Sequence, residues 1–313
     1  MQNKPAIRDD AAYLDLIKRI KVTNLLALPQ SAAKVLELSK NPANGPPEIA
    51  VPIAADMGLT SQVLKFVNSS FFGFQNKITT VQMAISLVCV RTIRNFVLWN
   101  AVFALLPNPK CGPFDLRVLC QDSLRRGSFA KVLAKFFKTV EPEELFVAGL
   151  LQDMAIPILA QLWPTEYGSI LTQHSKTGER ISSLEQATFG WNHGDAGAFL
   201  VREWGFGDEL AESIQNHVKD GSEKTSDMES VCDEIISLSS FLPSVLDKTW
   251  DNAELFFDRY NRMIAGINVD INVTELFSKT DEVFNELLSV TQMGHPVTPL
   301  VEFHKRYMES MNS

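Results

Sequence analysis

The sequence predicts an all-α protein, and three observations carry that prediction. From Pro29 onward, apolar residues recur at the three- and four-residue spacing of amphipathic helices, and no stretch alternates as a strand between hairpin turns does. Short clusters of proline, glycine and asparagine separate these stretches. The 313 residues are 45% hydrophobic and 21% charged, which is typical of a globular protein. A chain of this length is long enough for several packed lobes.

Within residues 29–106, helices are predicted from the residues that can start them and from their apolar faces. Pro29 suits a first helical turn, because its missing N–H has no partner within the helix there. Either Thr79 or Thr80 can cap one long apolar helix that reaches Leu106. In order, the expected helices span residues 29–40, 48–56, 60–70 and 80–106.

A second block of helices is expected over residues 114–218. Pro142 opens a helix whose first turn carries Glu143 and Glu144, the charge that the helix dipole favours. The apolar stretch that follows, 145–163, has a membrane-like composition, but Asp153 near its centre favours a buried core helix. The expected helices of this block span residues 114–138, 142–163, 164–176, 182–190, 193–204 and 208–218.

One short helix of this block has a recognisable start. Ser182 and Glu185 form a capping-box pattern for the helix that ends at Gly190, since the hydroxyl and the carboxylate can each satisfy a free backbone N–H. After a polar loop at 219–227, further helices are expected over residues 228–241, 250–263, 273–289 and 299–311.

The net charge of the chain and its first ten residues indicate which partners and which location to expect. With 29 basic and 37 acidic residues the net charge is −8, which gives no electrostatic surface for a nucleic-acid backbone. Residues 1–10 lack the apolar segment of a signal peptide. We therefore expect a cytoplasmic protein that binds neither nucleic acid nor membrane.

Common enzyme motifs are missing from the sequence. There is no phosphate-binding loop, no GxGxxG, no GxSxG and no HExxH, and the cysteines lack paired zinc spacing. Gly205-Phe206-Gly207 is read as a turn between helices. The remaining candidates are polar residues within apolar helical sequence: Asp122, Gln152, Asp153, His174, His193, Asp195 and His217.

Each of these candidates also has a structural explanation. A lone Asp in a buried helix is usually a hydrogen-bonded structural group, because an unpaired buried carboxylate is too costly to keep. His193 stands where it can cap the following helix, and His217 stands at the end of one, where a histidine interacts favourably with the helix dipole.

The segment Gly149-Leu150-Leu151-Gln152-Asp153-Met154-Ala155 resembles the GLLHDIG segment of the HD phosphohydrolase superfamily, with Gln152 in place of its histidine. Further motifs resemble the HDOD family, the HD-related output domains. Upstream these are Leu28-Pro29, the turn at 56–60, Val67-Asn68-Ser69-Ser70-Phe71-Phe72-Gly73 and the helix start at 80–85. Downstream they are Glu185-Gln186-Ala187-Thr188-Phe189-Gly190, His193-Gly194-Asp195-Ala196-Gly197-Ala198 and Trp204-Gly205-Phe206.

This resemblance spans about residues 25–218, and Asn216-His217 stands where the family often shows two histidines. Two departures are visible: the family commonly has DP where Asp56-Met57 stands and LG where Val88-Cys89 stands. Neither departure is expected to break the fold. The resemblance implies an HD-domain-like multi-helical array with an additional N-terminal helical lobe. The expected parts are an N-terminal extension (1–24), an N-terminal lobe (25–110), an HD-like core (111–218) and a C-terminal helical region (219–313).

The resemblance also indicates which chemistry has been lost. In a catalytic HD protein, histidines and aspartates on neighbouring helices hold a metal ion that activates water for phosphoester attack. By position, the first histidine falls near Asp122, the HD histidine on Gln152, the HD aspartate on Asp153 and the late aspartate near Ser239. Only Asp153 survives, and a neutral amide is a poor substitute for imidazole.

We therefore expect a non-catalytic signalling module, of the kind that the resemblance places in bacterial signal transduction, with no cofactor and no metal. Its partner would be a protein or a small anionic effector. The expected binding residues are Asp122, Gln152, Asp153, His193 and His217. The alternative is a residual phosphohydrolase that uses a divalent metal ion on a nucleotide or cyclic dinucleotide.

The location of the site is a further expectation. Ligand sites concentrate at domain junctions, so we expect this one between the N-terminal lobe and the helices that carry Asp122, Asp153 and His193. Arg125 and Arg126 can attract an anion, although a solvated helix face is the preferred interpretation of this pair.

Overall fold

A computed structural model of the chain describes residues 11–22, 27–69, 72–137, 140–219, 231–265, 271–291 and 297–311. All regular structure in these residues is helical, and the prediction of an all-α fold is confirmed. Of the polar loop expected at 219–227, residues 220–227 lie outside the described residues, as does the start of the helix expected at 228.

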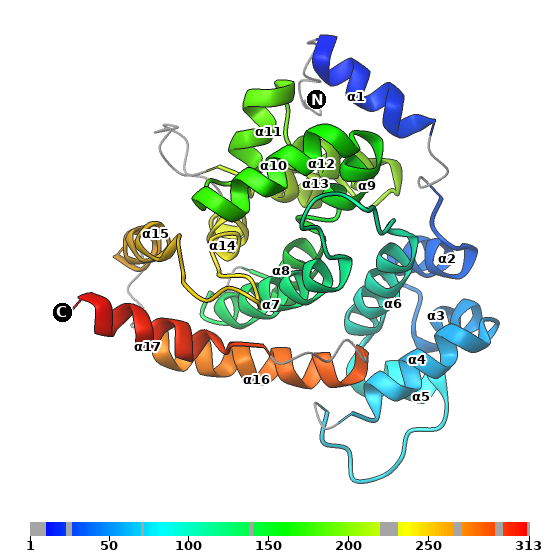
Figure 1. The fold of residues 1–313 in the computed structure, drawn as a ribbon. Coiled ribbons are helices and arrows are strands. Elements are labelled where there is room, and N and C mark those ends of the chain that lie inside the picture. The colour runs from blue at the N-terminus through cyan, green and yellow to red at the C-terminus, as the bar shows by residue number, and fades with distance from the viewer. Residues whose placement is uncertain are drawn as a thin grey trace.

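The N-terminal lobe contains α2 (Gln30–Ser39), α3 (Pro46–Ala54), α4 (Met57–Val67), α5 (Val81–Val88) and α6 (Val90–Leu105). Its helix starts follow from local chemistry. The Asp56 carboxylate accepts a hydrogen bond from the Leu59 N–H, and the Thr80 hydroxyl accepts one from the Met83 N–H, so both α4 and α5 are capped by their own sequence. A further helix, α1 (Ala11–Lys21), precedes the lobe and packs against α12 (Figure 1).

The prediction of one long helix from residue 80 to Leu106 is wrong. Cys89 has a φ of 80° and a ψ of 155°, so the chain turns there by 118° between α5 and α6. Glycine is the residue suited to this conformation, and the family commonly has glycine at this position. The cysteine keeps the turn at the cost of backbone strain, which is why helix periodicity alone did not reveal the break.

The second block of helices, expected over residues 114–218, contains α7 (Leu116–Ala134), α8 (Pro142–Leu151), α9 (Ala155–Leu162), α10 (Pro164–Thr177), α11 (Ile181–Phe189), α12 (His193–Glu203) and α13 (Asp208–Asn216). The helix expected over 142–163 is therefore two helices, separated by a turn at residues 152–154. The expected turn at 205–207 is confirmed, since Gly205 and Gly207 both have positive φ between α12 and α13.

The C-terminal region contains α14 (Val231–Ser239), α15 (Ala253–Ala265), α16 (Val273–Thr291) and α17 (Leu300–Met311). Helix α16 lies along α7, and α14 packs against both α7 and α8 (Figure 1). Helix α7 therefore lies between two apolar cores: Leu124 belongs to the core shared with the N-terminal lobe, and Phe129 to the core shared with α14–α17.

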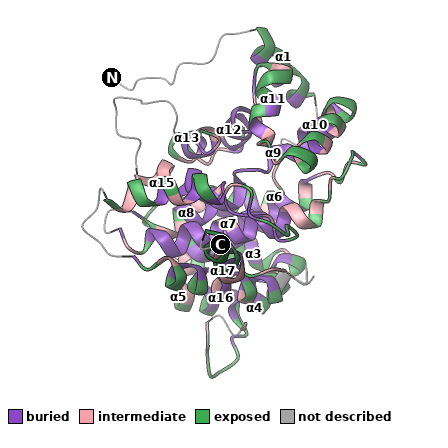
Figure 2. Cartoon of the chain, turned by 60° about the vertical axis from the view of Figure 1, so that its left-hand side comes forward, coloured by how far each residue is buried: buried purple, intermediate pink, exposed green. Residues whose placement is uncertain are grey.

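Helices α7 and α8 are mostly buried (Figure 2). Among the described residues, the stretch Pro142–Leu162 is long and apolar enough to cross a membrane by length and composition. However, 89% of its most apolar window is buried inside the protein, as expected for a core helix.

Two glycines explain how closely these helices cross. A Cβ at Gly127 of α7 would lie 2.9 Å from the Phe146 carbonyl oxygen, and one at Gly149 of α8 would lie 2.8 Å from the Cα of Gly127. The backbones of α7 and α8 are in direct contact at Gly127 and Gly149, so neither position has space for a side chain. The crossing brings the end of α8, and the turn that follows it, close to α7.

Candidate functional site: a buried Asp-His-His cluster

Asp153 is held in the turn between α8 and α9, directly after the close crossing with α7. Its side chain is 5% exposed. One carboxylate oxygen, Oδ1, faces two histidines, and the other, Oδ2, forms an ion pair with the Arg126 guanidinium of α7. A buried carboxylate requires such partners, because its desolvation is costly.

His193 is the first residue of α12 and does not itself cap the helix. The capping box is formed by Asn192 and Asp195, which exchange hydrogen bonds between side chain and backbone. This leaves the imidazole free to point inward, where its Nδ1 lies 2.6 Å from the Glu185 carboxylate. A carboxylate only accepts hydrogen bonds, so Nδ1 carries a proton and Nε2 faces the cluster.

His217 is the C-cap of α13, as its position in the sequence predicts. Its Nδ1 lies 2.5 Å from the carbonyl oxygen of Ile214 and therefore donates to it. Helices α12 and α13 approach closely because Gly194 has no side chain: a Cβ there would lie 3.0 Å from the Gln215 carbonyl oxygen. This approach brings the two histidines together.

The three side chains converge on one point. Asp153 Oδ1 lies 3.4 Å from His193 Nε2 and 3.5 Å from His217 Nε2, and the two Nε2 atoms are 3.1 Å apart. Burial lowers the pKa of His217 well below its ordinary value, and the neighbouring His193 adds to the effect. A neutral His217 whose Nδ1 carries the proton presents an Nε2 lone pair to the cluster. Two such nitrogens at this distance need a proton or a cation between them.

Gln152 does not join this cluster. It is fully buried, and its Oε1 accepts a hydrogen bond of 3.0 Å from the hydroxyl of Ser239 on α14. These are the positions that the family resemblance assigns to the HD histidine and the late aspartate. The fold brings these two positions together, and an amide and a hydroxyl form a hydrogen bond there.

Asp122 also faces away from the cluster. Its two oxygens accept hydrogen bonds of 2.7 Å from the Ser244 hydroxyl and the Val245 backbone N–H. Burial raises the pKa of Asp122, while Arg126 and these two hydrogen bonds oppose the rise. Asp122 therefore fixes the loop between α14 and α15 to α7.

The preferred interpretation of Arg125 and Arg126 as a solvated face is wrong. Arg125 is 1% exposed and donates to the carbonyl oxygens of Pro243 and Thr298, with its guanidinium over the ring of Phe284. The Arg126 side chain is 17% exposed and pairs with Asp153. Arg125 is covered by the segments at Pro243 and Thr298, and Arg126 meets Asp153 in the turn after α8, so both partners are distant in sequence and a local pattern does not reveal them.

Glu185 has a different role from the one that the capping-box pattern predicts. Helix α11 begins at Ile181, and the fully buried Glu185 accepts hydrogen bonds from the Tyr167 hydroxyl, the His193 backbone N–H and the His193 ring. It orients the histidine from behind, as carboxylates do for metal-binding histidines. The signal for this role was present in the family motif, which includes both Glu185 and His193.

The HD superfamily implies a divalent metal ion, so the residues can be tested for fit. The ligand atoms of Asp153, His193 and His217 all lie within 4.8 Å of one another, and two histidines with one carboxylate suit a borderline divalent ion. The superfamily's own ligand set is not supplied, because Gln152 and Asp122 are engaged elsewhere. The residues therefore fit a single ion held by three ligands.

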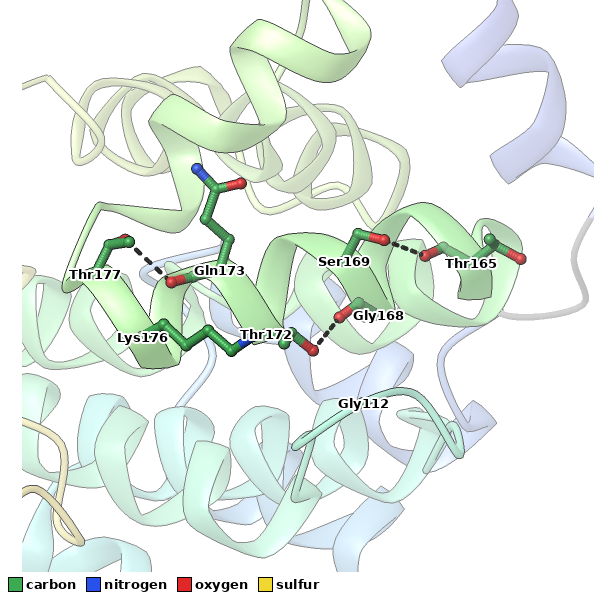
Figure 3. A pocket seen from close by; sticks show the side chains of 8 residues that line it. All are labelled: Gly112, Thr165, Gly168, Ser169, Thr172, Gln173, Lys176 and Thr177. Carbon is green, nitrogen blue, oxygen red and sulfur yellow. Dashed lines mark hydrogen bonds between the residues drawn. The ribbon is translucent and has the colours of Figure 1, made fainter.

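The contacts described around the cluster come from α7, α11, α12, α13 and the turn after α8, and none of them from the N-terminal lobe. An open surface groove lies elsewhere, along α10 (Figure 3). It is lined by Gly112, Thr165, Gly168, Ser169, Thr172, Gln173, Lys176 and Thr177, none of which is a predicted site residue. Its hydroxyls at 169, 172 and 177 donate to carbonyls of α10 itself.

Comparison with known structures supports the fold. A structure named "HDOD domain protein with unknown function" from Geobacter sulfurreducens is 17% identical and aligns with a TM-score of 0.67 over 89% of this chain and 97% of its own. One named "Putative phosphohydrolase" from Shewanella amazonensis is 20% identical, with a TM-score of 0.65 over 91% and 97%. One named "Putative signal transduction protein" from Marinobacter aquaeolei is 19% identical, with a TM-score of 0.66 over 90% and 65%.

Comparison of sequences identifies the family. An uncharacterized protein of Treponema pallidum (strain Nichols) is 22% identical over 194 residues, which cover 61% of this chain and 37% of that protein. The chain thus spans about a third of that relative's length. A sequence model of the HDOD domain matches residues 25–219, in agreement with the resemblance found in the motifs. Because this match spans more than half of the chain, the protein belongs to the HDOD domain family.

Proposed function

We propose that the protein is a non-catalytic regulatory module of signal transduction, which binds a protein partner or a small effector. The observation that carries this proposal is the hydrogen bond between Gln152 and Ser239. The fold still brings these two positions together, but neither side chain is a strong metal ligand. The resemblance to the HD phosphohydrolases therefore extends to the fold but, on this proposal, not to the reaction.

The surroundings of Asp153 support the same proposal. Its charge is already paired with Arg126, and the candidate residues are at most 9% exposed. A phosphoester needs access to the ion and to the attacking water, whereas a regulatory site requires only that binding at one place shifts the packing of another. We place this module in the cytoplasm, with no nucleic-acid or membrane partner, in line with its net charge of −8.

Capture of partners from the native cell lysate, followed by reconstitution from purified components, tests the binding role. We expect a partner that binds the purified full-length chain at a defined stoichiometry. If neither a protein nor a small molecule is retained through purification and reconstitution, the regulatory proposal is contradicted.

A second function is favoured by one observation, the convergence of Asp153, His193 and His217. It is a residual metal-dependent phosphohydrolase acting on a nucleotide or cyclic dinucleotide. Incubation with both substrate classes and with Mn²⁺, Fe²⁺, Zn²⁺ or Ni²⁺ distinguishes the two functions. Product formation that is lost in Asp153→Ala would establish the enzyme, and the preferred substrate class would then identify its role.

A further inference from the structure

In the Asp-His-His cluster, Asp153 faces two histidine nitrogens with one oxygen and a positive charge with the other. Glu185 and the Ile214 carbonyl fix the Nδ1 protons of the two histidines, so both Nε2 atoms are aimed at Asp153 Oδ1. This is the arrangement by which second-layer hydrogen bonds prepare histidines to bind a metal. Yet the same carboxylate already pairs with a fixed positive charge, that of Arg126.

The Arg126 guanidinium and a divalent ion would repel each other if both were bound to the Asp153 carboxylate. A guanidinium on Oδ2 lies within a few ångströms of any cation on Oδ1, and repulsion between two cations is strong at a buried site. Arginine does not lose its charge at any ordinary pH. The guanidinium must therefore move for a cation to be held well.

The structure offers Arg126 a route out. Its side chain is 17% exposed, whereas the Asp153 side chain is only 5% exposed, so the arginine is the partner that can reach solvent. The carboxylates of Asp122 and Asp247 already attract the Arg126 guanidinium, and Asp247 is exposed. The arginine can leave Asp153 without losing all acidic partners.

We propose that Asp153, His193 and His217 bind one divalent transition-metal ion, and that the ion displaces Arg126 from Asp153. Arg126 is thus the internal counter-ion of the site and keeps its cation affinity low. Any proton held between the two Nε2 atoms leaves to solvent as the ion enters. This inference rests on the proposed function, because it names the ligand class to which a regulatory site responds.

Titration of the metal-free full-length protein with Co²⁺, followed by visible absorption and calorimetry, tests the displacement. In Arg126→Gln the competing charge is gone, and we expect Co²⁺ to bind about tenfold tighter or better than in the wild type. Binding should be lost in the double variant Arg126→Gln, Asp153→Asn. Helical content by circular dichroism is compared first for every variant.

Arg94→Gln is the matched control. Its side chain is 16% exposed and pairs with Glu144 in the first turn of α8, at the opposite end of that helix from Asp153, so its loss should leave Co²⁺ affinity unchanged. Equal or weaker Co²⁺ binding in Arg126→Gln would overturn the proposal. So would Co²⁺ binding that survives Asp153→Asn.

A second measurement uses the wild type and does not depend on a variant that folds. Phenylglyoxal modifies accessible arginines, and peptide mapping gives the rate at Arg126. Saturating Co²⁺ should raise that rate severalfold and leave the rate at Arg94 unchanged. An unchanged modification rate at Arg126 overturns the displacement. The displacement is also overturned if the wild type binds no Co²⁺ and Arg126→Gln either binds none or does not fold.

The failure of this inference is distinguishable from failure of the proposed function. Nucleotide hydrolysis lost in Asp153→Ala would contradict the regulatory role whatever the Co²⁺ affinities are. Conversely, equal Co²⁺ affinities of the wild type and Arg126→Gln contradict only the displacement of Arg126 and leave the regulatory role untouched.

Discussion

At the scale of single residues, Cys89 has a backbone conformation that suits glycine better than cysteine. A φ of 80° with a ψ of 155° is tolerated well only by glycine, and strain of this kind costs about 1–3 kcal/mol. The cysteine Sγ lies 3.4 Å from the Thr92 hydroxyl, a weak contact beside the start of α6. The turn is maintained by the packing on both sides of it.

Replacing Cys89 by glycine should therefore stabilise the protein. The relief of strain exceeds the extra entropy that glycine loses on folding, and we expect a gain of about 1 kcal/mol in the free energy of unfolding. Urea unfolding followed by circular dichroism measures it. Cys89→Ala keeps the Cβ and should show no comparable gain, and a loss of stability in Cys89→Gly would refute the strain.

Glu185 is the residue on which the orientation of His193 depends. It is fully buried and accepts three hydrogen bonds, from the Tyr167 hydroxyl and from the backbone and ring of His193. In Glu185→Gln an amide N–H₂ group replaces one acceptor oxygen. This group faces the N–H or O–H donors of Tyr167 and His193, so at least one hydrogen bond is lost. We expect a loss of about 2 kcal/mol in the free energy of unfolding, measured in urea at neutral pH.

Glu144→Gln serves as the comparison for that variant, because the Glu144 side chain is 51% exposed and its ion pair with Arg94 is on the surface. Its effect should stay within about 0.5 kcal/mol. If Glu185→Gln is as mild as Glu144→Gln, the carboxylate does not hold His193 in place.

At the scale of elements, close approach between helices decides the site. The α7–α8 crossing at Gly127 and Gly149 places Asp153, and the α12–α13 approach at Gly194 joins the two histidines. Local signals predicted most of the helices themselves, because Thr80 and Pro142 each act on their own turn. The start of α4 was missed, since Asp56 caps that helix although 56–60 was expected to be a turn.

The crossing at Gly149 can be tested directly. Alanine favours a helix over glycine by about 1 kcal/mol, but a Cβ at Gly149 would lie 2.8–3.0 Å from backbone atoms of α7. We expect Gly149→Ala to lose about 2 kcal/mol or more in the free energy of unfolding. Differential scanning calorimetry should show a lower melting temperature.

Gly168→Ala is the control for this helix-interior substitution. Gly168 lies within α10, and its nearest neighbours to a new Cβ are 3.8 Å away, so propensity alone should make the variant slightly more stable. A neutral or stabilising Gly149→Ala would show that α7 and α8 can move apart without loss.

At the scale of the whole molecule, the sequence predicted the helical class and the HDOD family, but not which residues meet. Asp153, His193 and His217 were candidates whose convergence depends on packing between α12 and α13. The pairing of Arg126 and the burial of Arg125 depend on partners far along the chain, such as Pro243 and Thr298. Short-range patterns contain no information on such contacts.

The C-terminal region matters to the site for the same reason. Ser239 of α14 bonds to Gln152, and the loop that follows α14 holds Asp122 through Ser244 and Val245. Residues beyond the matched domain at 25–219 thus supply hydrogen-bond partners to Gln152 and Asp122. The polar interior of the candidate site therefore depends on residues on both sides of the domain boundary.

The most direct test of this account compares hydrolysis of bis(p-nitrophenyl) phosphate and cyclic dinucleotides by the wild type and Asp153→Ala, with bound metal counted in the same samples. Because Gln152 and Ser239 bond to each other where metal ligands are needed, we predict no hydrolysis above that of Asp153→Ala at any metal content. Hydrolysis that rises with bound metal in the wild type and vanishes in Asp153→Ala would contradict the central claim.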